Sequence, residues 1–368
     1  METISFARGN PSPDILPVEE LADCAQAVLA RDGRRILNYG PAFGYRPLRE
    51  WIAAQHDVDP SRVLVSTGSL QGYNFAIRHL FGDGGRAVVE APSYDRTIKV
   101  LRYLHADIAS VALDDDGLDL GRLEALTAER PAPGLFYTIP TFQNPSGRTL
   151  SLEQRHAVAE LAQAGRILVF EDDPYRLVRY EGEPLPSMFE LAGGEGVLFS
   201  SSFSKTGAPG LRVGYLIVPP AMIEAMEDIA AQTYIGPPLL TQAMLFEFID
   251  RGRFEPNLAG VCDALQARRD AMLETLAAEM PEGARWSRPE GGYFLWLDLP
   301  SGVDCASVAA RAKEAGVTVV KGTDFYAGPG GEESLRLAFS FVSVDEIREG
   351  IRRLGAAVTE AAVVPARG

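Results

Sequence analysis

Between residues 62 and 219 the chain repeats one pattern, in which a short apolar, β-branched segment is followed by a stretch with helical periodicity. This alternation is typical of a mostly parallel sheet with helices on both faces, because parallel strands must be joined by long crossover connections. The expected strands are Arg62–Ser66, Arg86–Glu90, Ile108–Leu113, Gly134–Ile139, Arg166–Glu171, Val197–Ser201 and Val213–Val218. The sequence therefore predicts an α/β fold built on a seven-stranded sheet.

A second, smaller region of different character follows Pro237-Pro238. Its expected elements are, in order, helices Leu239–Arg251 and Glu255–Met280, strand Tyr293–Leu299, helix Asp304–Ala315, strands Val317–Val320 and Ser334–Phe339, and a closing helix. The closing helix opens with Ser343-x-x-Glu346, the pattern of a capping box. We predict a large domain at residues 46–240 and a smaller α+β domain at 241–368, with which the N-terminal segment 1–45 packs.

The composition argues against several classes of protein. A net charge of −15 without a basic run disfavours nucleic-acid binding. The three cysteines, Cys24, Cys262 and Cys305, lie far apart, which suits a reducing compartment. The four histidines show no metal-ligand spacing, no apolar run could span a membrane, and no signal peptide is evident. We expect a cytoplasmic protein that binds no metal, nucleic acid or membrane.

Lysine is rare in this chain, since only four of its 35 lysines and arginines are lysines, at positions 99, 205, 313 and 321. A lysine amine can lose its proton and attack a carbonyl, whereas a guanidinium stays protonated. Lys205 lies in a run of small, hydroxylated residues and glycines, Ser201-Ser202-Phe203-Ser204-Lys205-Thr206-Gly207, and Arg212 follows. This combination favours a site for an aldehyde cofactor that carries a phosphate.

Polar residues follow five of the expected strands at the point where each strand ends. In chain order they are Thr67-Gly68-Ser69-Leu70, Tyr94, Asn144, Asp172 with Tyr175, and Lys205 with Arg212. Free N–H groups at the helix start after Gly68 favour an anion, and a carboxylate that ends the apolar run 167–170 needs a partner. The carboxyl ends of parallel strands meet at one edge of the sheet, where ligands bind. We therefore expect these residues to form one site.

In this order the motifs resemble the fold-type I enzymes that use pyridoxal 5′-phosphate (PLP), and most closely the class I/II aminotransferases of the aminoadipate and multi-substrate branch. The resemblance covers nearly the whole chain. The matching segments include Asn38-Tyr39-Gly40-Pro41, Thr67-Gly68-Ser69, Ala91-Pro92-Ser93-Tyr94, Gln143-Asn144-Pro145-Ser146-Gly147, Glu171-Asp172-Asp173-Pro174-Tyr175-Arg176, Ser202-Phe203-Ser204-Lys205, Pro209-Gly210-Leu211-Arg212, Pro289-Glu290-Gly291-Gly292-Tyr293 and Leu335-Arg336-Leu337.

The resemblance implies PLP as cofactor and a role for ten residues in holding it. Lys205 would be the catalytic residue that forms the Schiff base, and Asp172 would pair with the pyridine nitrogen. The other expected contacts are Ser69, Leu70, Ser202 and Arg212 at the phosphate, Tyr94 stacked on the ring, Asn144 and Tyr175 at the phenolic oxygen, and Tyr39. Because Tyr39 lies in the family's segment that reaches the neighbour's phosphate, a homodimer with shared active sites is also implied.

The resemblance further implies a substrate site. Arg336 matches the arginine that binds the substrate α-carboxylate in a bidentate fork, helped by Asn144. A helical arm that usually precedes the segment Ser5–Asn10 is expected to be missing or rebuilt, and this segment contributes Gly9 and Arg8 as candidate substrate contacts. Arg8 stands where these relatives usually have glycine. It either reads an acidic group of the substrate or is an ordinary surface arginine.

The leading expectation is an aminotransferase that moves an α-amino group between an L-amino acid and a 2-oxo acid by a ping-pong mechanism. One alternative is another PLP reaction on the same scaffold, such as β-elimination, cyclisation or oxidation of an amino acid. A second alternative is a PLP-domain ligand sensor that regulates transcription. The sensor is disfavoured because no DNA-binding domain precedes the motifs.

Overall fold

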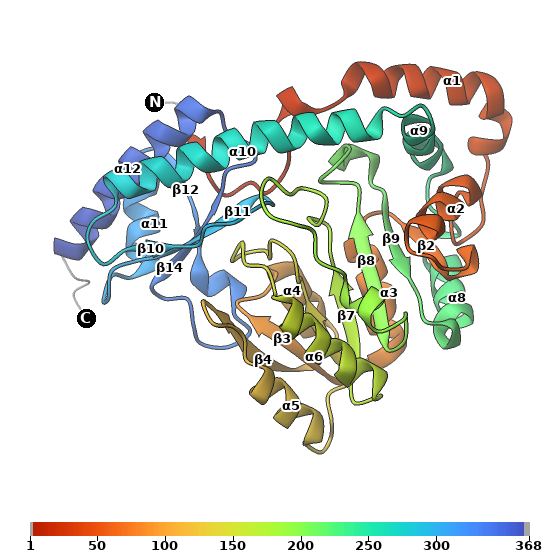
Figure 1. Cartoon of the computed structure of the whole chain (residues 1–368), viewed down its shortest axis with the longest axis horizontal. Coiled ribbons are helices and arrows are strands. Elements are labelled where there is room, and N and C mark those ends of the chain that lie inside the picture. Colours follow the sequence, from red (N-terminus) through yellow and green to blue (C-terminus); the bar gives the residue numbers. More distant parts are fainter. Residues whose placement is uncertain (1–2, 364–368) are drawn as a thin grey trace.

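A computed structural model of the chain describes residues 3–363. Its main sheet has the strand order β2-β9-β8-β7-β6-β3-β4-β5 (Figure 1). The strands are β2 (Val63–Ser66), β3 (Arg86–Ala91), β4 (Asp107–Asp114), β5 (Gly117–Leu118), β6 (Leu135–Thr138), β7 (Leu168–Asp172), β8 (Val197–Ser202) and β9 (Gly214–Ile217). All seven expected strands are present within two residues at each end, and the two-residue β5 is an addition. Strand β9 runs antiparallel to both of its neighbours, β2 and β8, so the sheet is mostly but not wholly parallel.

Helices cover both faces of this sheet, and successive strand residues point into different cores. Leu64 belongs to one apolar cluster and its neighbours Val63 and Val65 to the other. The same alternation holds for Phe170 and Val169, as the two-residue period of a strand requires. Strands buried on both sides therefore read as continuous apolar runs, which is why their positions could be predicted.

The helices of this region follow the strands in sequence. They are α2 (Arg46–Gln55), α3 (Ser69–Phe81), α4 (Asp95–Tyr103), α5 (Leu120–Ala128), α6 (Leu152–Gln163), α7 (Met188–Leu191) and α8 (Ile223–Tyr234). Helix α6 shows why such elements begin where they do. The Ser151 hydroxyl accepts from the N–H of Gln154, whose side chain accepts from the Ser151 N–H in return. Gly165 then takes a φ of 65° just after the helix, where a left-handed residue ends it.

A smaller four-stranded antiparallel sheet has the order β10-β11-β14-β13. Its strands are β10 (Arg285–Trp286), β11 (Phe294–Asp298), β13 (Val320–Lys321) and β14 (Ser334–Ala338). Nearby, β1 (Ile4–Ser5) pairs in parallel with β12 (Val317–Thr318), which joins the N-terminal segment to this region. Helices α11 (Cys305–Glu314) and α12 (Val344–Val363) accompany these strands. The predicted capping box of α12 is present, because Ser343 and Glu346 exchange hydrogen bonds.

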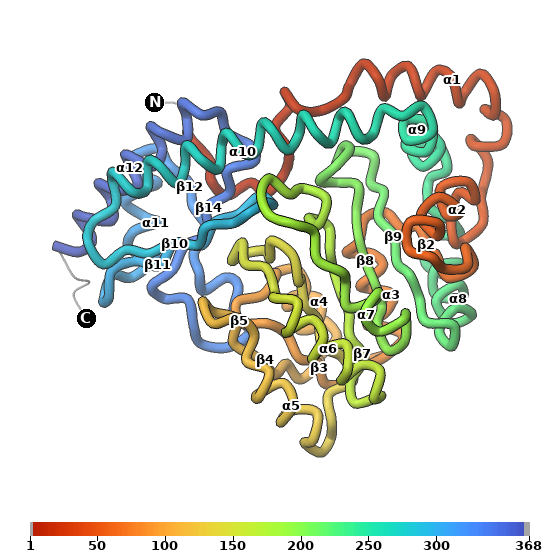
Figure 2. Tube along the Cα trace, in the orientation of Figure 1, coloured from red at the N-terminus to blue at the C-terminus, as the bar shows by residue number. Residues whose placement is uncertain are grey.

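Three further helices connect the two regions. Helix α10 (Phe254–Glu279) runs from the end of α9 (Leu239–Asp250) to the smaller sheet, as the Cα trace in Figure 2 makes clear. Helix α1 (Val18–Ile36) packs against α9, and both contribute to the same apolar cluster as β2. The division into residues 46–240 and the remainder stays a prediction. Across residues 3–363, none of the helices combines the length and apolarity that a membrane span needs.

Candidate active site

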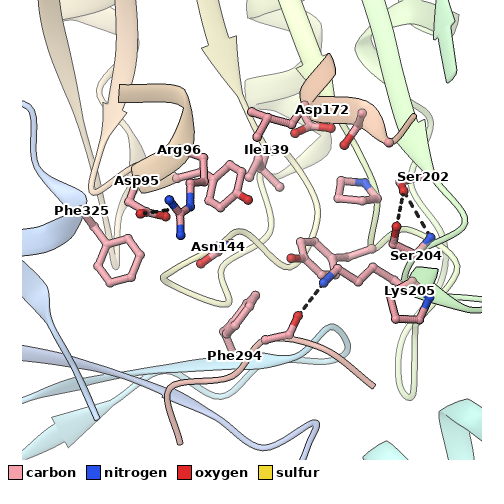
Figure 3. Close-up of a pocket in the computed structure, with 18 of the residues that line it drawn as sticks. Asp95, Arg96, Ile139, Asn144, Asp172, Ser202, Ser204, Lys205, Phe294 and Phe325 are labelled. Carbon is pink, nitrogen blue, oxygen red and sulfur yellow. Dashed lines mark hydrogen bonds and ion pairs between the residues drawn. The ribbon is translucent and has the colours of Figure 1, made fainter. Parts of the chain in front are cut away.

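A cavity of about 500 Å³ opens where the carboxyl ends of the parallel strands face the smaller sheet (Figure 3). Most of the residues that the sequence singled out converge on it. Those lining the cavity are Gly9, Ser69, Leu70, Tyr94, Asn144, Asp172, Tyr175, Ser202, Lys205, Arg212 and Arg336. Five strand ends, the N-terminal segment and strand β14 thus supply a single site.

Lys205 lies in the turn after β8, and its side chain reaches across to the N-terminal segment. The Nζ atom donates to the carbonyl of Gly9 at 2.5 Å and lies 5.0 Å from the centre of the Tyr293 ring. Burial lowers the pKa of Lys205 to about 8, with further lowering by Arg336 and Arg212, and with Asp172 opposing. About half of such an amine is neutral near pH 8, and the neutral amine is the nucleophilic form.

Asp172 ends β7 with its carboxylate buried. Oδ2 accepts from the hydroxyl of Tyr137 at 2.8 Å, while Oδ1 has no hydrogen-bond partner within residues 3–363. Burial raises the pKa of Asp172 to about 7, with the nearby Asp173 adding to the increase and the Tyr137 hydroxyl opposing it. A buried acceptor without a donor is costly unless a ligand supplies one. A protonated ring nitrogen would be such a donor.

A cradle for an anion lies at the start of α3. The backbone of Gly214 comes so close to the nitrogen of Ser69 that a Cβ would not fit there, and Gly68 takes a φ of 92°, which favours glycine. Arg212 is held in place because its Nη2 donates to the carbonyl of Thr67 at 2.8 Å. Free N–H groups of a helix start beside a guanidinium form a phosphate-binding site.

Two hydroxyls complete this cradle. Ser202 Oγ lies 2.9 Å from Ser204 Oγ, and both residues line the cavity. The sequence reasoning named Ser202 but missed Ser204. The signal was present, since both belong to the hydroxyl-rich run before Lys205.

Arg336, in β14, lies at another side of the cavity between two aromatic rings. Its guanidinium carbon is 4.5 Å from the centre of the Phe294 ring and 5.0 Å from that of Phe325. Nη1 donates to Oδ1 of Asn144 at 3.1 Å, and Nη2 donates to the carbonyl of Ala7 at 2.7 Å. Arg336 and Asn144, 192 residues apart in sequence, are therefore in contact at this cavity.

Two of the candidate residues lie outside the cavity lining. Tyr39 has 82% of its surface exposed, and its ring is available to a second molecule. The guanidinium of Arg8 lies 4.9 Å from the centre of the Phe341 ring. Gly9 does line the cavity, and a Cβ there would press against the tip of the Phe294 ring, so that a larger residue would require this ring to move.

The sequence reasoning missed a group of charged and aromatic residues that line the cavity. They are Asp95, Arg96, Lys99, Asp324 and Phe325. The first three occupy the first turns of α4, directly after Tyr94. Lys99 was visible as one of four lysines, but nothing in the local pattern indicated which way α4 would face.

These features fit PLP at three points. The α3 cradle suits its phosphate, the orphaned Oδ1 of Asp172 suits its ring nitrogen, and the amine of Lys205 suits its aldehyde. All three groups line one cavity. A molecule that carries an anion, a basic ring nitrogen and an aldehyde would satisfy each of them at once.

Comparison with known proteins agrees with this fit. Residues 2–354 match the family model of class I and II aminotransferases. A 2-aminoadipate transaminase of Thermus thermophilus is 36% identical over 96% of this chain and 90% of its own, and aromatic-amino-acid aminotransferase 1 of Thermococcus litoralis is 33% identical over 98% and 88%.

Among solved structures, LysN, an α-aminoadipate aminotransferase from Thermus thermophilus complexed with N-(5′-phosphopyridoxyl)-L-leucine, superposes with a TM-score of 0.93 at 36% identity, over 98% of this chain and 94% of its own. Family, relatives and structural neighbour thus agree on one fold, fold-type I, and on one cofactor. The chain belongs to the class I and II aminotransferases, PLP-dependent enzymes that transfer an amino group between an amino acid and a 2-oxo acid.

Proposed function

We propose that the cavity is the transamination site of this enzyme and that Lys205, Asp172 and Arg336 have separate tasks in it. The observation that carries this proposal is that Asp172, whose buried Oδ1 has no partner within residues 3–363, lines the same cavity as Lys205, an amine whose pKa burial lowers. PLP, when bound, supplies an electron sink for the charge left when the substrate loses its α-proton. Every other task falls to the side chains.

Arg336 binds the substrate α-carboxylate. Its guanidinium is fixed by Asn144, by the carbonyl of Ala7 and by two aromatic rings, and Nε is left without a partner within residues 3–363. A planar guanidinium holds a carboxylate in one orientation through paired hydrogen bonds. Fixing the carboxylate fixes the direction of the Cα–H bond, which selects the bond that breaks.

Lys205 moves the α-proton once its amine is free. A pKa near 8 suits this task, because a base whose pKa is close to the working pH can both accept and return a proton. Asp172 keeps a proton on the ring nitrogen through its unpaired Oδ1.

The remaining contacts hold the cofactor in place. Ser69, Leu70, Ser202 and Arg212 bind the phosphate, and Tyr94 covers the face of the ring. Asn144 and Tyr175 donate to the phenolic oxygen. Each of these residues lines the cavity, which supports the assignment.

A homodimer is part of the proposal. Tyr39 is exposed although it is a large aromatic residue, and it follows helix α1 at the surface. Burial of this ring in a second subunit would explain the exposure and would bring its hydroxyl to the partner's phosphate site. We also propose a cytoplasmic location, which the three free cysteines support.

The names of the relatives support α-amino acids as substrates without agreeing on the side chain. One is named for 2-aminoadipate and another for aromatic amino acids. Gly9 remains a candidate substrate contact because it lines the cavity beside Lys205. Arg8 has less support, because its guanidinium stacks on Phe341.

The decisive experiment combines Lys205→Ala with chemical trapping. Borohydride reduction of the wild-type holoenzyme should attach the cofactor irreversibly to the peptide that contains Lys205. Lys205→Ala should lower turnover by at least about 10⁴-fold, since the nucleophile and the proton-transfer group are lost together. Attachment to Lys99, Lys313 or Lys321 would falsify the proposal.

A further inference from the structure

The first two turns of α4 place two cations at the mouth of the active-site cavity. Arg96 and Lys99 both line the cavity, although neither belongs to the cofactor site described above. The Arg96 side chain is 59% exposed, and its one ion pair, from Nε to Asp95, is long at 3.7 Å. No hydrogen bond to another side chain or to the backbone holds this guanidinium within residues 3–363. Its N–H groups are therefore available to a ligand.

Asp95 does not neutralise both of these cations. Its carboxylate lies 2.5 Å from Nζ of Lys99, a much closer pair than the one it forms with Arg96. Asp324 also lines the cavity, and its carboxylate is 4.0 Å from Nζ of Lys321, a longer pair than the one between Arg96 and Asp95. The start of α4 adds the positive end of a helix dipole. The carboxylates of Asp95 and Asp324 thus offset part of the positive charge here, and Arg96 is less closely paired than Lys99.

The position of Arg96 relative to the carboxylate clamp is informative. Figure 3 shows the Arg96 guanidinium directed into the space between Asn144 and Phe325, on the side of the cavity away from Lys205. Asn144 and Phe325 are also the residues that contact Arg336. Two guanidinium groups therefore face the same part of the cavity. A ligand with two carboxylates could reach both.

We propose that Arg96 is the residue that selects the substrate side chain, by binding a second carboxylate, and that Lys99 assists through its charge. The preferred substrates are then amino acids and 2-oxo acids with an acidic side chain. This inference rests on the proposed role of Arg336 as the clamp for the α-carboxylate. Arg96 on α4 thus takes the role of binding the acidic group of the substrate, for which Arg8 was the candidate from the sequence.

The first test measures selectivity. We expect wild-type holoenzyme to convert glutamate and 2-aminoadipate with a higher kcat/KM than leucine or phenylalanine. Arg96→Met should lower kcat/KM for the acidic amino acids about 10- to 100-fold, as loss of a charged hydrogen bond predicts, while leaving leucine within about twofold. Lys99→Met should have a smaller effect in the same direction, since Lys99 is already paired with Asp95.

The matched control is Arg348→Met on α12. Arg348 is as exposed as Arg96, and it too has a 3.7 Å ion pair with an aspartate close in sequence, Asp345. The substitution removes the same charge far from the cavity, so selectivity should not change. An equal loss in both variants would mean that net charge alone attracts acidic substrates, and it would overturn the assignment of Arg96.

The second test measures binding without turnover. Calorimetry of the holoenzyme with glutarate and with pentanoate compares a dicarboxylate and a monocarboxylate of equal length. Arg96→Met should weaken glutarate binding about tenfold or more and leave pentanoate binding unchanged. If Arg8→Met weakened glutarate binding and Arg96→Met did not, Arg8 would be the residue that binds the second carboxylate, and the assignment to Arg96 would be wrong.

The outcomes separate this inference from the proposed function. Wild-type enzyme that transaminates apolar amino acids but not acidic ones would overturn the role of Arg96 and leave the proposed function standing. A broad panel that gave ammonia, a cyclised product or peroxide instead of transamination would remove the proposed function, and the inference with it.

Discussion

The two ends of the active-site cavity are built in different ways. At the cofactor end, buried strand ends and glycines leave no spare room, as the positions of Gly68 and Gly214 show. At the substrate side-chain end, the lining comes from the start of α4 and from the segment containing Asp324, and the side chains there are partly exposed. The cofactor is the same molecule in every turnover, so its site gains from rigidity. The substrate side-chain end must bind both an amino acid and a 2-oxo acid, and the charged side chains there are less constrained.

Changes at the cofactor end should therefore lower kcat or the affinity for PLP whatever the substrate, whereas changes at the substrate end should act on kcat/KM and depend on the substrate. The largest effect among these tests is expected for Asp172→Asn. Without the carboxylate the ring nitrogen loses its proton, and we expect kcat to fall about 10²- to 10³-fold, comparable to the loss of other preorganised charges. Stopped-flow absorbance of the half-reaction measures this. An unchanged kcat would show that Oδ1 does not face the ring nitrogen.

Arg336→Lys comes next, at the boundary between the two ends. Lysine keeps the charge but loses the planar fork, so we expect kcat/KM for every α-amino acid to fall about 10- to 100-fold, whatever the side chain. Steady-state kinetics with an acidic and an apolar amino acid provide the comparison. A loss confined to acidic substrates would mean that Arg336 binds the side-chain carboxylate of the substrate and not its α-carboxylate.

The lowered pKa of Lys205 predicts a pH dependence in the apoprotein. Because its pKa is about 8 and not 10.5, Lys205 becomes neutral at lower pH than an ordinary lysine and should be acylated faster at pH 8. From the neutral fractions alone the advantage is on the order of 100-fold. Mass spectrometry of partly labelled apoprotein, compared with PLP-loaded protein, would measure it. Labelling of Lys205 with a midpoint near pH 10 would contradict the burial effect.

Ser202→Ala should give the smallest effect. It removes one hydroxyl from the phosphate cradle, and we expect PLP to bind about tenfold more weakly while kcat of the saturated enzyme changes little. The matched control is Ser201→Ala, because the neighbouring hydroxyl donates instead to the carbonyl of Asp173. Equal loss of PLP affinity in both variants would indicate a general loosening of β8. Spectroscopic titration of apoprotein distinguishes the two outcomes.

The difference between the two ends also explains what could be predicted. Asp172 and Lys205 became candidates because each lies at or just after the end of an expected apolar strand, and such a position can be read from the local sequence. Arg96 was not among the candidates, because the role proposed for it depends on where α4 lies relative to residues such as Asn144 and Phe325. Asn144 and Phe325 are far from Arg96 in sequence, and they come near α4 only in the folded chain.

The sequence by itself determined the α/β class, the strand positions and the edge at which the cofactor residues gather. These follow from hydrophobic periodicity and from strand ends, which are local properties of the chain. Only the tertiary structure decided the reversed direction of β9, the meeting of Arg336 with Ala7 and the orientation of Arg96 toward the cavity. The direction of a strand and the orientation of a side chain depend on how elements far apart in sequence pack together. Burial of apolar surface is not directional, so one hydrophobic pattern is compatible with several arrangements of the elements.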